Sequence, residues 1–105
     1  MIYIALNPQG GIPVGQARFD IDHKAATISI SIDQQFRGQG LGSVLIRRAC
    51  HELFAHSDVS TVHAYIKFGN ERSVRAFEKA GFNRLANVDV KGSAALHLIL
   101  SKEVA

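Results

Sequence analysis

The sequence is poor in several features that define large classes of protein. It has one cysteine, Cys50, no tryptophan and two prolines among 105 residues, which excludes an intramolecular disulfide framework and favours a cytoplasmic protein. Apolar runs reach only about five residues, far below the roughly 18 of a membrane span. The N-terminus also lacks the basic start and long apolar stretch of a signal peptide. With 47% hydrophobic and 20% charged residues, the composition predicts a single domain over residues 1–105.

Positive charge is concentrated in the middle of the chain. The net charge is +3, and residues 37–84 hold eight Lys and Arg against four Asp and Glu. Such a field attracts phosphate groups of a nucleic acid or of a small anionic cofactor, although the solvated faces of two helices would explain the same charges. Because no RNA-stacking motif, zinc finger or basic arm accompanies it, nucleic acid is the less favoured partner. The five histidines lack metal-ligand spacing, so no metal site is predicted.

Hydrophobic periodicity divides the chain into strands and helices. Apolar residues three and four apart predict a helix over residues 41–55. A second helix follows the cap residue Asn70 and ends at Gly81. Alternating or short apolar runs predict six strands, over residues 2–6, 12–21, 26–33, 61–66, 83–90 and 94–101.

The order of these elements, β-β-β-α-β-α-β-β, predicts a mixed sheet. Residues 12–21 and 26–33 are separated by a few polar residues, which is typical of an antiparallel hairpin. The strand over 26–33 leads through the first helix to the strand over 61–66, and such crossovers are right-handed and join parallel strands. The fold class is therefore α/β, with one mixed sheet.

A glycine-rich loop joins the third strand to the first helix. Residues 37–42 read RGQGLG, and glycines there let the backbone come close to a ligand. Unpaired N–H groups of the first helical turn point at an anion, to which Arg37 adds charge. A dinucleotide fingerprint would need glycine at 43 or 45, where Ser43 and Leu45 stand, and the P-loop lysine is absent. A plain tight turn is the alternative, but three alternate glycines after an arginine exceed what a turn requires.

Two motifs resemble the signatures of the GNAT family of acetyl-CoA-dependent N-acetyltransferases. Arg37-x-x-Gly40-x-Gly42 is similar to the family's Q/R-x-x-G-x-G/A signature for acetyl-CoA. Downstream, residues 70–82 (NERSVRAFEKAGF) resemble the family's N-x-x-S-x-x-x-[YF]-E-K-x-G-F helix. The resemblance covers roughly residues 12–100 and implies a GNAT-like fold.

The resemblance also implies where acetyl-CoA binds. The pyrophosphate lies on the glycine loop, and the pantetheine arm runs between the strands over 26–33 and 61–66. The backbone of residues 30–32 bonds the pantetheine amides and the acetyl carbonyl, as an oxyanion hole does. The implied cofactor-binding residues are Ile30, Ser31, Ile32, Arg37, Gly38, Gln39, Gly40, Leu41, Gly42, Ser43, Asn70, Ser73 and Phe77.

The reaction that the resemblance implies is direct attack of a primary amine on the thioester. Many members use a tyrosine of the second motif to protonate the departing sulfur, but this chain has Phe77 there, which donates no proton. The catalytic candidates are Tyr65 and Asp33, with His63 or an ordered water as alternatives. An amino sugar or nucleotide sugar is the first candidate acceptor. The competing hypothesis is an acetyl-CoA-binding accessory module or remnant domain without efficient catalysis.

The segment before the hairpin is short for such a protein. Family members usually carry one or two helices between the first strand and the hairpin, whereas only residues 1–13 precede the hairpin strand here. The expectation is a domain truncated at the N-terminus. A second subunit that completes the acceptor site, giving a homodimer, is one way to supply the missing wall.

Overall fold

The structure of the chain is a computed structural model that describes residues 1–6, 11, 13–33, 37–38 and 40–103. The predicted order of elements is confirmed; α2 ends two residues before Gly81, and the other boundaries that differ from the prediction do so by one residue. The elements are β1 (Ile2–Leu6), β2 (Pro13–Asp22), β3 (Ala25–Ile32), α1 (Leu41–His56), β4 (Thr61–Lys67), α2 (Glu71–Lys79), β5 (Asn83–Val90) and β6 (Ser93–Ser101).

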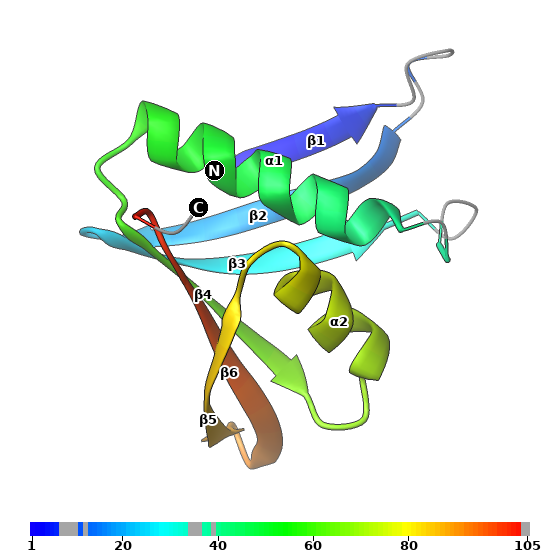
Figure 1. The fold of residues 1–105 in the computed structure, drawn as a ribbon, viewed down its shortest axis with the longest axis vertical. Coiled ribbons are helices and arrows are strands. Elements are labelled where there is room, and N and C mark those ends of the chain that lie inside the picture. Colours follow the sequence, from blue (N-terminus) through cyan, green and yellow to red (C-terminus); the bar gives the residue numbers. More distant parts are fainter. Residues whose placement is uncertain (7–10, 12, 34–36, 39, 104–105) are drawn as a thin grey trace.

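The strands form one mixed sheet in the order β1-β2-β3-β4-β6-β5 (Figure 1). Neighbours are antiparallel except β3 and β4, whose parallel pairing confirms the predicted crossover through α1. The turn between β2 and β3 contains His23, and the turn between β5 and β6 contains Lys91, both with positive φ. The mixed α/β fold expected from the element order is therefore present.

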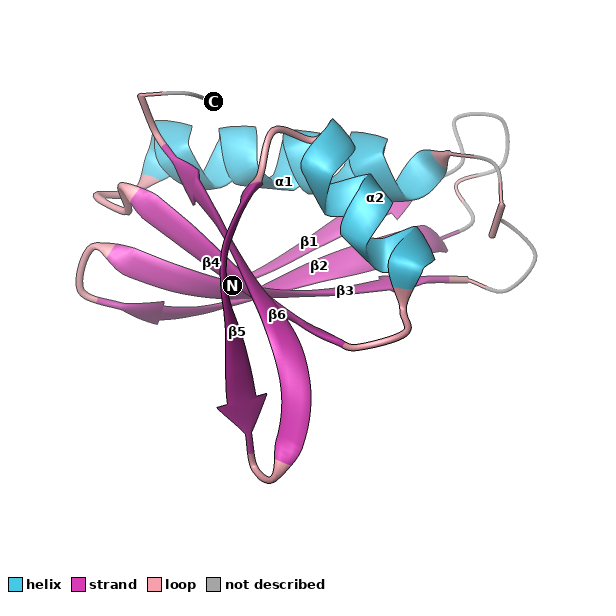
Figure 2. Cartoon of the chain, turned by 60° about the horizontal axis from the view of Figure 1, so that its bottom comes forward, coloured by secondary structure: helices cyan, strands magenta, loops and turns pink. Residues whose placement is uncertain are grey.

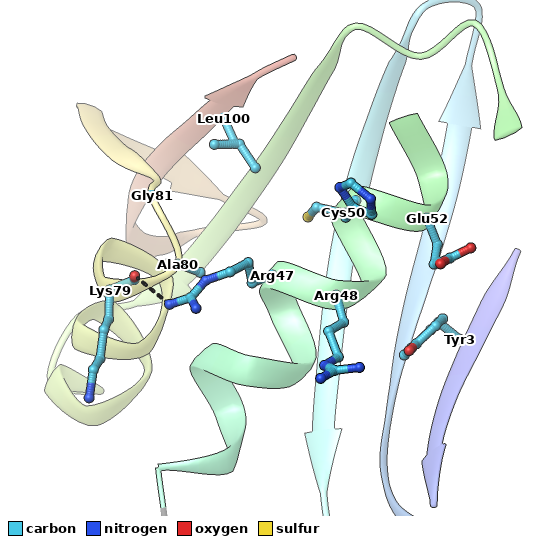
Figure 3. Close-up of a pocket in the computed structure, with 10 residues that line it drawn as sticks. Tyr3, Arg47, Arg48, Cys50, Glu52, Lys79, Ala80, Gly81 and Leu100 are labelled. Atoms are coloured by element: carbon cyan, nitrogen blue, oxygen red, sulfur yellow. Dashed lines mark hydrogen bonds between the residues drawn. The ribbon is translucent and has the colours of Figure 1, made fainter. Parts of the chain in front are cut away.

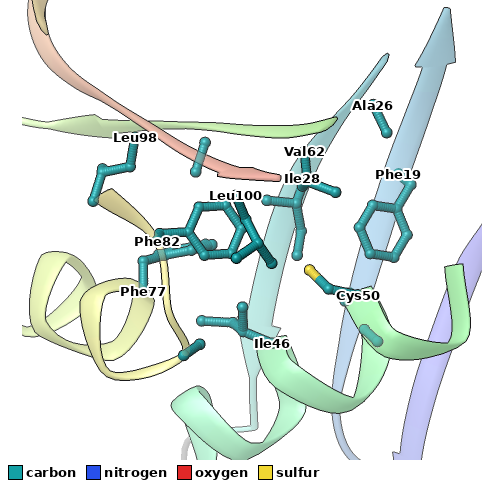
Figure 4. Packing of buried hydrophobic residues seen from close by; sticks show 14 of the residues in the cluster. Phe19, Ala26, Ile28, Ile46, Cys50, Val62, Phe77, Phe82, Leu98 and Leu100 are labelled. Atoms are coloured by element: carbon teal, nitrogen blue, oxygen red, sulfur yellow. The ribbon is translucent and has the colours of Figure 1, made fainter. Parts of the chain in front are cut away.

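Both helices pack on the same face of the sheet (Figure 2). The core lies between them and the strands, and Phe19, Ile46, Leu53 and Leu98 are among its fully buried side chains (Figure 4). Each such burial contributes roughly 1.5–3 kcal/mol. In the described part of the chain, neither helix is long and apolar enough to cross a membrane.

The opposite face of the sheet carries the alternate residues of each strand. No helix of the described ranges covers it. On β1, Ile2, Ile4 and Leu6 are 56%, 54% and 55% exposed. On β4, His63 is half-buried and Tyr65 is exposed on this same side. We call it the open face.

The parallel strands β3 and β4 stay together only at their beginnings. Ala25–Thr27 pair with residues 61–63, and no further pair joins the two strands in the described residues. β3 continues to Ile32 and β4 to Lys67, and the strands diverge (Figure 1). Backbone groups on the two facing edges are thereby left without a strand partner.

Close approach of β2 and β3 requires glycine at position 15. A Cβ added to Gly15 would lie 2.5 Å from the Ser31 carbonyl oxygen and 2.9 Å from Cδ1 of Ile32. We expect Gly15→Ala to lower the free energy of unfolding by about 1–3 kcal/mol, the usual cost of overpacking, measured by urea denaturation. Gln16→Ala changes the exposed neighbour and is the control. Equal midpoints for both variants would contradict this reading.

Candidate functional site

A groove lies between α1, α2 and the end of β3. Figure 1 shows the two helices beside the part of β3 that diverges from β4. Three segments line it: the end of β3, the glycine loop with the first turns of α1, and one side of α2. The lining residues are Ile30, Ser31, Ile32, Arg37, Gly38, Gly40, Leu41, Gly42, Ser43, Ile46, Asn70, Arg72, Ser73, Arg75, Ala76 and Lys79.

The start of α1 is built from backbone rather than from side chains. Gly40 is the N-cap, with φ 73° and ψ 10°, in the left-handed region that favours glycine. Because glycine has no side chain, the cap residue cannot satisfy the first N–H groups of the helix. The first turn contains no acidic residue, and the Ser43 hydroxyl donates to the Gly40 carbonyl at 3.3 Å. These N–H groups are therefore suited to an anion.

One side of α2 adds positive charge to the groove. The Asn70 side-chain oxygen accepts a hydrogen bond from the Ser73 backbone N–H at 3.4 Å, which confirms the predicted cap. Arg72, Arg75 and Lys79 of α2 also line the groove. These three cations lie beside the start of α1, which no side chain caps. The groove therefore favours a ligand with several phosphates.

The structure brings together almost all residues that the resemblance assigns to cofactor binding. Each described member of that set except Phe77 lines the groove, and Gln39 lies outside the described residues. Motif analysis missed Ile46, Arg72, Arg75, Ala76 and Lys79. The helical spacing of 72, 75, 76 and 79, together with the positive charge of residues 37–84, was the signal available for most of them.

Phe77 is a core residue, which corrects its assignment to the cofactor site. Its side chain is 2% exposed and meets Phe82 edge-on, with ring centroids 5.0 Å apart (Figure 4). The reason is its place on α2, where Val74 and Phe77 form the buried side of the helix. The groove is lined instead by the neighbouring Ala76 and Ser73.

The catalytic candidates lie outside the groove lining. Tyr65 is 45% exposed on the open face, and its ring stacks on that of His97 at 4.4 Å with an interplanar angle of 17°. Asp33 follows β3 directly, is exposed, and donates its backbone N–H to the Val14 carbonyl at 2.8 Å. His63 contacts His97, with 2.9 Å between Nδ1 and Nε2. Tyr65 lies two residues beyond the last pair of β3 and β4, and Asp33 lies six residues beyond it, on strands that diverge.

His97 is a residue that sequence reasoning missed. It lies on β6, opposite Tyr65 in the antiparallel register with β4. No motif contains it, and its neighbours depend on a strand pairing that spans more than 30 residues of sequence. Only the register of β4 and β6 could have identified it.

A second groove lies along the middle of α1, with Lys79, Gly81 and Leu100 on one side of the helix and Tyr3 on the other (Figure 3). Arg47 donates from Nη2 to the Lys79 carbonyl at 3.4 Å, joining α1 to the end of α2. Cys50 borders this groove but is buried, and burial raises the pKa of its thiol to about 12. Cys50 is thus a core residue and a poor nucleophile. The groove is lined by Tyr3, Arg47, Arg48, Cys50, His51, Glu52, Lys79, Ala80, Gly81 and Leu100.

The raised pKa of Cys50 predicts an unreactive thiol. At pH 8 its thiolate fraction is about 1,000-fold below that of an ordinary cysteine. We expect iodoacetamide to label the folded protein at least about 1,000-fold more slowly than the chain in urea, as measured by intact mass. Labelling of the folded protein at the unfolded rate would show that Cys50 is accessible and ionised.

Comparison with known proteins agrees with the two motifs. The profile described as the Acetyltransferase (GNAT) family matches residues 2–82. The kanamycin resistance protein of Rhizobium radiobacter is 30% identical over 66 residues, which are 63% of this chain and 61% of that protein. Aminoglycoside N(6')-acetyltransferase type 1 of Klebsiella pneumoniae is also 30% identical over 66 residues, 63% of this chain and 33% of that protein.

The fold comparison extends over nearly the whole chain. A crystal structure of an aminoglycoside acetyltransferase in complex with coenzyme A and kanamycin superposes with a TM-score of 0.86 and 25% identity. The match covers 98% of this chain and 67% of that one. The matched regions span one third to two thirds of these two curated relatives. With the profile matching most of its length and both signature motifs lining or flanking the groove, the chain belongs to the GNAT family of acetyltransferases.

Proposed function

We propose that the chain is an N-acetyltransferase that uses acetyl-CoA and transfers the acetyl group to a primary amine. One observation carries the proposal: the glycine start of α1, the cations of α2 and the unpaired edge of β3 line one groove. Each of these three parts suits a different part of acetyl-CoA. The family's relatives named as acetyltransferases support the same activity.

The groove matches the ligand part by part. The first-turn N–H groups at residues 40–43 suit the pyrophosphate, and Arg37 adds a positive charge beside them. Arg72, Arg75 and Lys79 supply the charge that a phosphorylated ligand requires. The edge of β3 around Ile30–Ile32, which no described strand pairs, offers backbone groups to the two amides of the pantetheine arm, and the Ile32 carbonyl there also accepts from Arg37 Nε at 3.2 Å.

Acetyl-CoA supplies an activated acyl group, and the chain's residues supply orientation and proton transfer. Backbone N–H groups near Ile30–Ile32 polarise the acetyl carbonyl in the manner of an oxyanion hole. The tyrosine that many members use is replaced by the buried Phe77, so we assign protonation of the departing sulfur to the Tyr65 hydroxyl. Asp33, which directly follows β3, is the second candidate.

The acceptor that we propose is an amino sugar, free or carried on a nucleotide. The relatives named for kanamycin resistance and aminoglycoside acetylation act on amino-sugar compounds by name. The competing function is an acetyl-CoA-binding module without efficient catalysis, and Phe77 in the core favours it. The cytoplasmic location stays a prediction from the lone cysteine.

Binding of acetyl-CoA is the first test. At a concentration 100 times the dissociation constant, acetyl-CoA should stabilise the fold by about 2.7 kcal/mol, seen as a higher melting temperature. Gly40→Val should remove the shift because its side chain would project into open space over the helix start. Gly92→Val is the matched control, since Gly92 also has positive φ and open space but lies in the β5–β6 turn.

Turnover separates the enzyme from the binding module. Wild-type protein should release free thiol from acetyl-CoA with glucosamine, kanamycin or spermidine as the amine, followed with a thiol-reactive dye. Binding without thiol release would favour the module. Absence of any thermal shift at millimolar acetyl-CoA would contradict both functions.

We further propose that two copies associate through β1. Among the described strands β1 pairs only with β2, so its other edge is free, and an uncharged edge strand tends to pair with another strand. A second β1 running antiparallel and centred on Ile4 would place apolar side chains opposite apolar side chains. The dimer would extend the sheet and bring a second chain beside the open face.

The dimer makes a specific prediction for Ile4→Lys. Light scattering should give the mass of two chains for the wild type and of one chain for this variant, because a lysine on the edge opposes pairing. Ile21→Lys, at an exposed position of β2, is the control and should remain dimeric. A wild-type mass of one chain at about 100 μM would overturn this assembly, since stable dimers have far lower dissociation constants.

A further inference from the structure

Two histidines form a direct pair on the open face of the sheet. Nδ1 of His63 on β4 lies 2.9 Å from Nε2 of His97 on β6, and the ring centroids are 5.1 Å apart. The Tyr65 ring stacks on the His97 ring, with centroids 4.4 Å apart. The three side chains form a continuous cluster that neither the glycine loop nor the second motif accounts for. We call it the histidine cluster.

The hydrogen bond between the rings fixes how the pair holds protons. One ring must donate an N–H and the other must accept it on a lone pair. In either arrangement of the two neutral rings, one outer nitrogen, His63 Nε2 or His97 Nδ1, carries a lone pair and the other carries a hydrogen. A proton taken up at one outer nitrogen can therefore be released at the other, when the shared proton shifts between the rings. The pair acts as a single acid–base unit.

The histidine cluster borders the point where β3 and β4 part. His63 is the last residue of β4 that pairs with β3, and Tyr65 is the next residue on the same side of the strand. The groove lies on the helix side of this parting, and the histidine cluster lies on the open face. A ligand in the groove whose reactive end passes between the strands would thus reach the histidine cluster from the helix side. A second reactant could reach the same cluster from solvent on the open face, past the exposed Tyr65.

The surroundings of His97 favour its neutral form. Desolvation and the nearby His63 both lower the pKa of His97. On the same face β4 contributes Tyr65 and Lys67, and a lysine opposes a second positive charge. From β5 the residue opposite His97 is Ala86, with Asn83 and Val88 at the neighbouring pairs, and none of these titrates. From β3, Thr27 pairs with His63 and does not titrate, and the carboxylate on this face is that of Asp20 on β2, opposite Thr27 and one strand further away.

We propose that the His63–His97 pair is the proton acceptor for the amine in the acetyl transfer, an inference that rests on the proposed function. The pair removes one proton from the ammonium form of the acceptor and passes it to solvent. The free amine then forms the carbon–nitrogen bond as the carbon–sulfur bond breaks. Tyr65 gives its hydroxyl proton to the leaving sulfur, and the second proton from the nitrogen replaces it. The products are an amide, a free thiol and one released proton, so atoms and charge balance.

Kinetics test the pair as a unit. His97→Gln should lower kcat by about 100-fold or more, the usual scale for loss of a general base, with the same thermal shift on adding acetyl-CoA as the wild type. His63→Gln should do the same. The double variant should fall no further than either single one, because the rings act together. His56→Gln, at the far end of α1, is the control.

The pH dependence distinguishes proton transfer from a structural role. For the wild type, kcat/KM should fall as the pH drops through the pKa of the pair, since protonated imidazoles accept no further proton. This limb should disappear in His97→Gln. A wild-type rate for His97→Gln in protein that melts normally and binds acetyl-CoA would overturn the inference while leaving the proposed function intact.

A readout without acetyl-CoA completes the test. Proton NMR titration of the free protein should give His97 a pKa below the ordinary value near 6.5, and His63→Gln should raise it because one cause of the depression is removed. An equal pKa of His97 in the wild type and in His63→Gln would show that the rings are not coupled, and would contradict their action as one acid–base unit. Failure of the proposed function would be seen in a different experiment, the thermal shift, as wild-type protein that acetyl-CoA does not stabilise.

Discussion

The parting of β3 from β4 is the constraint on which the rest of the site depends. Parallel pairing ends after Thr27 and His63, yet both strands continue, held from their outer sides by β2 and β6. Backbone N–H and C=O groups that would normally bond to the neighbouring strand are therefore left for another partner. On the helix side, the start of α1 and the cations of α2 converge over this opening. On the other side lies the histidine cluster.

The two helices follow from the same arrangement. The crossover from β3 to β4 must pass over the sheet, and α1, which begins at Leu41, is its helix. Gly40 takes the left-handed conformation at the N-cap and has no side chain, so no side chain caps the first N–H groups of α1. These groups are therefore suited to an anion. Packing of α2 beside α1 then closes the groove from its second side.

Elements with local signals were predictable from the sequence, and contacts across distant strands were not. Alternation in Ala25–Ile32 and three- and four-residue spacing in Leu41–His56 identify a strand and a helix within one residue. The glycine loop and Asn70 identify most of the groove because each acts through its own backbone neighbours. Phe77 was assigned to the wrong environment, since a motif records the residue type and not the direction of its side chain. His97 became visible only through the register of β4 and β6.

We infer that one ligand occupies the groove and the edge of the parted strands together. Backbone amide NMR during titration with acetyl-CoA can show this. Chemical shift changes should concentrate at two separate stretches of sequence, residues 40–43 at the start of α1 and residues 30–32 on β3, and spare the β5–β6 turn. Shifts confined to Arg48 and His51 in the second groove, or absent at both stretches, would contradict it.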